Sequence, residues 1–262
     1  MKIMEGNLPL QSSIVYGPVR SRRLGVSLGI NPLPFGYKLC SFNCLYCQYG
    51  WTSKPTLNPT HQLKDLPHPK EVSGALERSL QRMIRQRTKL DSITFSGNGE
   101  PTLHPDLAEI IAAARKLRDQ YAPSVKLAIL SNSSTVGRKE VRQALEMLDL
   151  RVMKLDAGSG EIIRRLDAPA YPFYLGEIIT GLKRLKNLTL QSLFVQGRVT
   201  NSDPDSVHQW VEIVEVIQPE LVQVYSLDRV PAERRLWKVN RATLEWIASQ
   251  VRWHAAVPAE VY

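Results

Sequence analysis

Three cysteines lie within eight residues of one another, in a C-x3-C-x2-C spacing: Cys40, Cys44 and Cys47. Thiolates this close in sequence can surround one metal centre, and soft sulfur ligands select zinc, copper(I) or an iron–sulfur cluster. A structural zinc requires a fourth protein ligand, but the chain has no fourth cysteine, and the nearest histidines are His61 and His68. A [4Fe–4S] cluster normally takes four thiolates. With three, one iron stays open for a substrate or a cofactor.

A second motif combines two glycines with an acidic residue, in the order Gly97-Asn98-Gly99-Glu100. Glycine lets a backbone approach a ligand closely, and the Glu100 carboxylate accepts a hydrogen bond from an ammonium group. The motif follows an apolar run and precedes a helical pattern, which places it at the end of a strand. We therefore expect it to line the same site as the cysteines.

Polar side chains also end three later apolar runs. Ser131 and Asn132 end one run, Lys154 and Asp156 end the next, and Tyr225 lies at the end of the last. Because side chains alternate along a strand, Lys154 and Asp156 are predicted to share one face. A mutually satisfied ion pair is the plainer interpretation of these two residues.

The cysteine spacing, with Tyr46 immediately before the last cysteine, resembles the signature of the radical S-adenosylmethionine (SAM) superfamily. The glycine motif resembles that family's G-G-E-P element, with Asn98 in place of its first glycine. Three further segments resemble one subgroup, which includes the tRNA-modifying enzyme 4-demethylwyosine synthase: Gly17–Gly25, Leu155–Gly158 and Tyr225–Arg229. Those tRNA enzymes carry additional N-terminal cysteines for a second cluster. This chain has only three cysteines, so the count excludes an auxiliary cluster.

The resemblance implies two cofactors, a [4Fe–4S] cluster on the three cysteines and SAM on its open iron. It implies reductive cleavage of SAM to a 5′-deoxyadenosyl radical, which abstracts hydrogen from the substrate, with electrons from a flavodoxin or ferredoxin. The three cysteines and Lys154 are then the expected catalytic residues. The implied SAM contacts are Tyr46 and Tyr225 near the adenine, Gly97, Asn98, Gly99 and Glu100 around the amino group, Ser131 and Asn132 beside them, Lys154 at the carboxylate, and Asp156 at the ribose.

Six short apolar runs bounded by turn-forming residues are expected to be strands: Leu24–Ile30, Ser92–Ser96, Lys126–Ser131, Val152–Asp156, Thr189–Val195 and Leu221–Leu227. Amphipathic stretches predict six helices: Ser73–Arg85, Pro105–Arg118, Arg138–Leu148, Tyr174–Leu185, Ser206–Ile217 and Arg241–Val251. Alternation of strands and helices demands right-handed crossovers and a mostly parallel sheet. The predicted fold class is α/β, a partial (βα)6 TIM-like barrel with ligands at the C-terminal strand ends.

The chain is predicted to form a single radical SAM core domain over residues 1–262. Residues 1–23 are expected to be an N-terminal lead-in to the first strand. The proline-rich residues 51–69 are expected to be a loop or lid. Residues 240–262 are expected to be a C-terminal helix and tail.

The composition, with 43% hydrophobic and 23% charged residues, is that of a globular protein and excludes disordered and collagen-like classes. The formal charge of +9 permits a polyanionic partner, but the basic residues are spread along the chain. No apolar run approaches the ~18 residues of a membrane span, so we expect no membrane partner. Three clustered cysteines argue against a disulfide framework and predict a cytoplasmic protein.

The sequence does not identify the substrate: a tRNA base, a small metabolite and a peptide are all candidates. The basic cluster of Arg20, Arg22 and Arg23 could contact phosphate, hold an anionic substrate, support the cysteine loop or simply be solvated. Two other function classes stay open, a nucleic-acid-binding α/β module with a structural zinc and an iron–sulfur electron-transfer protein. The plainest alternative is three cysteines buried as small core residues.

Overall fold

An eight-stranded sheet organises the protein, shown in a computed structural model that describes residues 6–57 and 64–262. Its strands lie side by side in chain order: β1 (Val15–Ser21), β2 (Gly25–Ile30), β5 (Ser92–Phe95), β6 (Lys126–Ser131), β7 (Leu150–Lys154), β8 (Leu188–Leu193), β10 (Leu221–Tyr225) and β12 (Ala259–Val261). From β2 to β12 all neighbours in this sheet are parallel, while β1 is antiparallel to β2.

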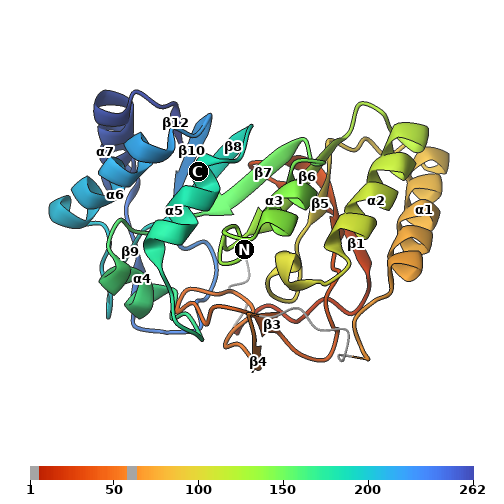
Figure 1. Cartoon of the computed structure of the whole chain (residues 1–262), viewed down its shortest axis with the longest axis horizontal. Helices are drawn as coiled ribbons and strands as arrows, with labels where there is room; N and C mark the ends of the chain where they lie inside the picture. The colour runs from red at the N-terminus through yellow and green to blue at the C-terminus, as the bar shows by residue number, and fades with distance from the viewer. Residues whose placement is uncertain (1–5, 58–63) are drawn as a thin grey trace.

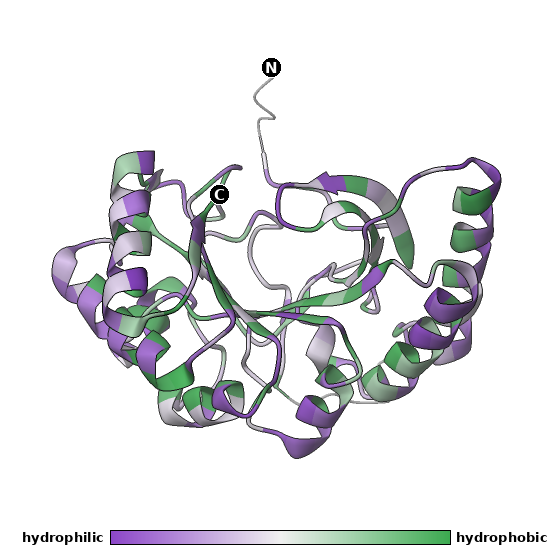
Figure 2. Cartoon of the chain, turned by 90° about the horizontal axis from the view of Figure 1, so that it is seen from above, coloured by the Kyte–Doolittle hydropathy of each residue, from purple (hydrophilic) through white to green (hydrophobic). Residues whose placement is uncertain are grey.

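Helices connect successive strands: α1 (Pro69–Arg85), α2 (Leu107–Tyr121), α3 (Lys139–Leu145), α4 (Gly160–Leu166), α5 (Leu175–Lys183), α6 (Pro204–Ile217) and α7 (Arg241–Gln250). In Figure 1, α1 and α2 lie at one end of the sheet and α6 and α7 at the other, with α3 and α5 between them. Seen from above, the sheet bends into an open arc with the helices on its outer side (Figure 2). The architecture is the predicted partial barrel.

The six predicted strands are the six central strands of the sheet, and each predicted helix is present with ends shifted by a few residues. Several elements were not predicted, among them three that belong to the main sheet and its helices. The supposed lead-in contains the edge strand β1, the supposed tail ends in strand β12, and the short helix α4 follows β7. Both edge strands are held by pairing with a neighbour more than by their own hydrophobic pattern.

The hydrophobic core lies between the convex face of the sheet and the helices. Leu28, Ile93 and Ile129 are fully buried there, in the same cluster as the apolar faces of α1 and α2. Because side chains alternate along each strand, the intervening residues face the concave side, the lumen. Polar groups gather on this face, as the 2.7 Å contact between the Ser27 and Thr94 hydroxyls shows.

The turn between β1 and β2, residues 22–24, contacts the far end of the sheet. Arg22 forms an ion pair with Asp228, which follows β10. The Arg23 guanidinium lies over the Tyr225 ring, with its carbon 4.5 Å from the ring centroid. Side chains of this turn therefore bridge the two ends of the arc, where no backbone ladder joins β1 to β12 among the described strands.

Short elements border the strand ends. β3 (Leu39–Cys40) pairs with β4 (Lys54–Pro55), and β9 (Val195–Gly197) pairs with β11 (Leu236–Lys238). The predicted lid of residues 51–69 thus contributes β4 and the first residue of α1, while residues 58–63 lie outside the described part of the chain. Among the described residues, no helix has the length and apolarity to cross a bilayer.

Candidate active site

The cysteine loop is joined to the glycine motif by backbone contacts. Leu39 and Gly99 form an isolated parallel bridge, in which Leu39 N–H donates to the Asn98 carbonyl (2.9 Å) and Glu100 N–H donates to the Leu39 carbonyl (3.0 Å). Gly99 has φ +135°, and a Cβ there would lie 1.7 Å from the Leu39 oxygen. The glycine is therefore required for the approach of two protein backbones, whereas the sequence suggested the approach of a ligand.

All three thiols are free and lie close to aromatic rings. Cys40 and Cys44 are buried in a small cluster with Phe42, against which Cys47 and Tyr46 also pack. Burial raises the pKa of the Cys40 thiol to about 11 and that of Cys44 well above its usual value. A thiolate at either position therefore needs a compensating positive charge, such as a bound metal supplies.

Lys38 is a buried cation beside these thiols, and the residue is only 3% exposed. Its Nζ donates to the Gly50 carbonyl at 2.9 Å. Burial alone would lower the pKa of Lys38, but its electrostatic interaction with Cys47, Cys40 and Cys44 outweighs burial and raises it. A fixed positive charge of this kind stabilises an anionic centre in the loop.

Glu100 is buried at the end of β5 and accepts four hydrogen bonds. Oε1 accepts from Thr102 N (3.0 Å), Thr102 Oγ1 (2.6 Å) and Ser131 Oγ (2.9 Å), and Oε2 accepts from Asn132 N (2.6 Å). Burial raises the pKa of this carboxyl, and the hydrogen bonds oppose the shift. The network fixes Glu100 next to the cysteine loop and leaves Oε2 with room for a further donor.

The two asparagines of the predicted site have different surroundings. Asn132 lies against the cysteine loop, since its Nδ2 donates to Ser41 Oγ (2.9 Å) and lies 3.5 Å from Cys40 Sγ. Asn98 is fully buried and its amide binds backbone groups of Gln11 and Pro34. Its side chain thus anchors the N-terminal segment. Its backbone is also bound by protein, because its N–H donates to Asn31 Oδ1 (3.1 Å) and its carbonyl accepts from Leu39 N–H.

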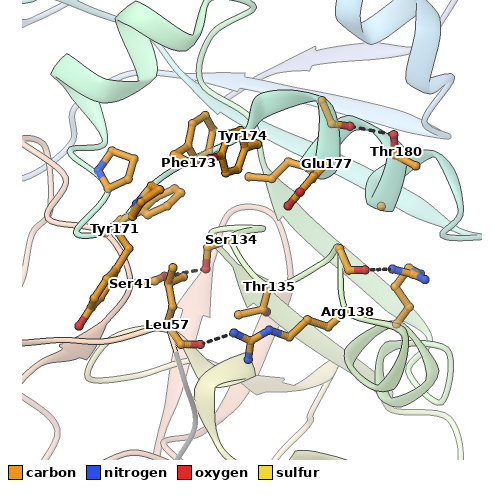
Figure 3. A pocket seen from close by; sticks show the side chains of 18 of the residues that line it. Ser41, Leu57, Ser134, Thr135, Arg138, Tyr171, Phe173, Tyr174, Glu177 and Thr180 are labelled. Atoms are coloured by element: carbon orange, nitrogen blue, oxygen red, sulfur yellow. Dashed lines mark hydrogen bonds between the residues drawn. The ribbon is translucent and has the colours of Figure 1, made fainter.

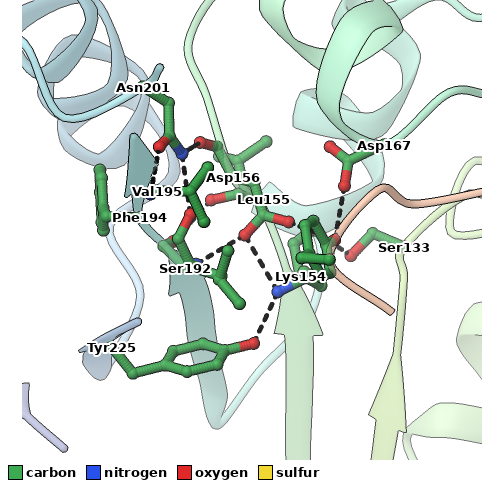
Figure 4. Close-up of polar contacts among 12 residues, drawn as sticks. Ser133, Lys154, Leu155, Asp156, Asp167, Ser192, Phe194, Val195, Asn201 and Tyr225 are labelled. Carbon is green, nitrogen blue, oxygen red and sulfur yellow. Dashed lines mark hydrogen bonds and ion pairs between the residues drawn. The ribbon is translucent and has the colours of Figure 1, made fainter. Parts of the chain in front are cut away.

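Lys154 and Asp156 share the lumen face at the end of β7, as their spacing predicts. Lys154 Nζ lies 3.0 Å from Asp156 Oδ1 and donates to the Tyr225 hydroxyl at 2.7 Å (Figure 4). Burial alone would lower the pKa of Lys154, but the Asp156 charge outweighs it and raises that pKa. Lys154 is therefore a fixed ammonium at neutral pH, suited to binding a carboxylate.

Tyr46 connects the cysteine loop to two buried carboxyl groups. Its hydroxyl lies 2.6 Å from Asp156 Oδ2 and 2.5 Å from Asp167 Oδ1. Burial, followed by the Asp156 charge, raises the pKa of Asp167 well above its usual value. The raised pKa favours the neutral form of Asp167, which lets both carboxyls share the Tyr46 hydroxyl without two adjacent negative charges.

A cavity of about 550 Å³ lies behind the cysteine loop, between α3 and α5. Ser41 and Ser134 border it on one side, and Tyr171, Phe173 and Tyr174 border it on another (Figure 3). Its basic residues are Arg138, Arg142 and Arg184. The cavity adjoins the cysteine loop from the outside, whereas the predicted SAM contacts face the lumen.

The structure thus brings most predicted site residues to one edge of the sheet, and it adds two that the sequence analysis missed. Lys38 could have been noticed two residues before Cys40. Asp167 has no local signal, because it meets Tyr46 only through the return of the chain after α4.

A parallel half-barrel with three free thiols at one strand end, and polar strand ends around them, defines an α/β protein built to carry an iron–sulfur centre. The chain belongs to the radical SAM superfamily, whose family model matches residues 36–217. Members of this superfamily use a [4Fe–4S] cluster and SAM.

Two relatives of known sequence match most of the chain. A protein of Brachyspira hyodysenteriae named GTPase Obg is 27% identical over 241 residues, which cover 90% of this chain and 33% of that protein. A UPF0026 protein of Methanocaldococcus jannaschii is 30% identical over 225 residues, which cover 85% of this chain and 66% of that protein. The chain therefore spans one third of the first relative and just under two thirds of the second.

Solved structures share the fold. A radical SAM methyltransferase from Sphaerobacter thermophilus matches with a TM-score of 0.66 at 15% identity, over 90% of this chain and 65% of that one. A structure of TYW1 with a lysine–pyruvate adduct bound matches with a TM-score of 0.61 at 19% identity, over 87% of this chain and 73% of that one. At these identities the likeness concerns the fold alone.

The three thiols fit a cluster better than a single ion. Among the described residues, no three histidine, cysteine or acidic side chains converge closely enough to hold one metal ion. Each thiolate of a [4Fe–4S] cubane binds a different iron, so its ligands stand farther apart than those of one ion. The nearby Lys38 cation suits the negative charge of such a thiolate-bound cluster.

Proposed function

We propose that this protein is a radical SAM enzyme that binds a [4Fe–4S] cluster through Cys40, Cys44 and Cys47 and cleaves SAM reductively. When bound, these groups supply a 5′-deoxyadenosyl radical that abstracts hydrogen from a substrate. The observation that carries the proposal is a loop with three free thiols, two of them buried, that is hydrogen-bonded through Leu39 to the backbone of Glu100.

The residues around the thiols offer complementary groups to a zwitterionic cofactor. Glu100 Oε2 would accept from the amino group of SAM, and the fixed ammonium of Lys154 would bind its carboxylate. Asp156 would hold the ribose hydroxyls, while Tyr46 and Tyr225 would flank the adenine. Ser131, Asn132 and the backbone of residues 97–99 would complete the wall.

Burial of the polar groups supports the proposal, because a closed site keeps adventitious hydrogen donors and dissolved oxygen away from a radical. Glu100 and Asp156 are each 2% exposed, and Asp167 is 4% exposed. Their hydrogen-bonding capacity is largely used by neighbouring protein groups. Rigid polar groups of this kind orient a ligand without bringing bulk water with them.

Two other function classes receive less support. A zinc-binding module would need ligands that converge on one ion, which the described residues do not provide. A simple electron carrier would not need the Glu100, Lys154 and Asp156 array beside its cluster. These polar strand ends favour an enzyme.

The substrate and subgroup are narrower proposals. The motifs shared with the 4-demethylwyosine synthase subgroup keep a tRNA base among the candidates, beside a small metabolite or a peptide. Because the raised pKa of Lys154 keeps its amine protonated, this lysine is a poor nucleophile for covalent attachment to a carbonyl compound. We assign it to carboxylate binding.

A flavodoxin or ferredoxin is the proposed reductant. The cavity behind the cysteine loop carries three arginines, which suits an acidic carrier protein. Arg184→Glu should slow reduction of the cluster by such a carrier and leave reduction by dithionite unchanged. If the carrier reduced the parent and Arg184→Glu at equal rates, docking at this face would be rejected.

Anaerobic reconstitution tests the main proposal. The purified protein should acquire iron, sulfide and an oxygen-sensitive brown absorption, and Cys44→Ala should lose them. With SAM and dithionite it should then form 5′-deoxyadenosine above the level of that variant. Stoichiometric zinc without iron, or absence of both SAM binding and 5′-deoxyadenosine in iron-loaded protein, would overturn the proposal.

A further inference from the structure

Arg23 places a second positive charge in the lumen, over the ring of Tyr225. Lys154 binds the hydroxyl of Tyr225, whereas Arg23 lies over its ring. With its amide oxygen turned towards Arg23, Gln191 accepts from both terminal guanidinium nitrogens. Arg23 is half-buried, so its charge is only partly solvated.

The two lumen cations differ in how their charge is balanced. Asp156 neutralises Lys154 at 3.0 Å. Asp228, three residues after Tyr225, pairs with Arg22 instead of Arg23. Within residues 6–57 and 64–262, Arg23 forms no ion pair with any carboxylate. A guanidinium that meets only neutral groups keeps an unneutralised charge and further N–H donors for binding an oxyanion.

Gln223 supplies an independent sign of a missing ligand. It lies two residues before Tyr225 on β10 and directly opposite Gln191 on β8, so it faces the same lumen wall. The residue is 4% exposed, and its Oε1 is buried without a hydrogen-bond partner among the described residues. An unsatisfied buried acceptor is costly, and a ligand that donates to it would remove that cost.

We propose that the lumen wall formed by Arg23, Gln191 and Gln223 is the substrate-binding subsite, and that it takes a substrate with a carboxylate or phosphate group. Arg23 binds that oxyanion, and Gln223 Oε1 accepts from an N–H or O–H of the same molecule. This assignment rests on the proposed function, because it places the substrate next to the SAM contacts Lys154 and Tyr225.

Chemical modification tests the oxyanion site without any turnover. Phenylglyoxal modifies accessible arginines, and peptide mass spectrometry follows Arg23 and, as a control on the outer face of α1, Arg82. Inorganic phosphate or acetate at about twice its Kd should slow modification of Arg23 about threefold, because protection follows 1 + [L]/Kd. Protection by phosphate alone, acetate alone or both identifies the group that the site prefers.

Three results would overturn the assignment: no protection by either anion, equal slowing of Arg23 and Arg82 by ionic screening, or protection by SAM alone. The last would place Arg23 in the cofactor site. The readout uses the reconstituted full chain but no turnover, so a failure here leaves the test of SAM cleavage untouched.

A matched pair of variants tests Gln223. Gln223→Leu removes an unpartnered acceptor and should raise the thermal midpoint of the ligand-free protein by about 2–4 °C. Gln191→Leu, on the same wall, removes an acceptor of Arg23 and should lower the midpoint. A lower midpoint for Gln223→Leu would show that its amide is already satisfied and would overturn its role as a ligand acceptor.

Discussion

Gly99 joins the cysteine loop to the strand end that carries Glu100, and Gly99→Ala is expected to separate them. The added Cβ would lie 1.7 Å from the Leu39 oxygen, while ordinary contacts begin near 3.4 Å. The two backbones must therefore move apart, at a residue whose φ of +135° already disfavours alanine.

The structure sets the size of the effect. Separation breaks the 2.9 and 3.0 Å bonds that Leu39 makes with Asn98 and Glu100. Each buried backbone group left unpaired costs about 1–3 kcal/mol, and the backbone strain costs about 1–3 kcal/mol more. The loss is thus at least about 3 kcal/mol, a large part of the 5–15 kcal/mol that typically stabilises a domain.

Urea unfolding of the cofactor-free protein, followed by circular dichroism, measures this loss. Gly36→Ala is the matched control, because Gly36 lies in the segment between β2 and β3 that leads to Leu39, and a Cβ there meets nothing within 4 Å. The control should stay within about 0.5 kcal/mol of the parent. Iron content after reconstitution should fall for Gly99→Ala only. A cost below about 1 kcal/mol, or full iron binding despite lost stability, would refute the reasoning.

Two further predictions concern buried and partly buried charges. Asp156→Asn leaves the Lys154 ammonium unpaired and should cost about 3–5 kcal/mol in urea unfolding at pH 7. Asp167→Asn replaces a carboxyl whose raised pKa favours the neutral form, so it should cost less than about 1 kcal/mol; equal costs for the two variants would contradict this assignment. Asp149 accepts from Arg118 Nη1 (2.6 Å) and Leu127 N (2.8 Å); burial opposes these bonds, but they lower its pKa below 3.8. The contribution of Asp149 to stability is therefore full above pH 3.8 and is lost as the pH falls through the lowered pKa. The difference in unfolding free energy between the parent and Asp149→Asn should shrink towards pH 2. A difference that stays constant with pH would contradict this prediction.

The interior strands were predictable because each carries its own apolar run and turn-forming boundary. β1 and β12 were not, for a physical reason. Val15–Ser21 includes a glycine and a proline and is mostly exposed, and Ala259–Val261 is only three residues long. Edge strands form through pairing with a neighbour, which a local pattern does not record.

The candidate site divides in the same way. The cysteines, Glu100 and the Lys154–Asp156 pair follow from motifs and strand alternation. Asp167 does not, because its meeting with Tyr46 depends on a contact between residues 121 positions apart. The structural role of Gly99 was also not predictable, because the sequence does not show whether the group that approaches a glycine is a ligand or another part of the backbone.

The order of strands in the sheet bears on how the chain assembles during synthesis. Each strand from β2 to β12 pairs with the one before it in the sheet, so no later strand has to insert between two that are already paired. A nascent chain leaving the ribosome can therefore extend its sheet from one edge only. The thiols of residues 40–47 emerge before the strand ends that enclose them, which leaves an interval in which iron and sulfide can reach the loop from solution.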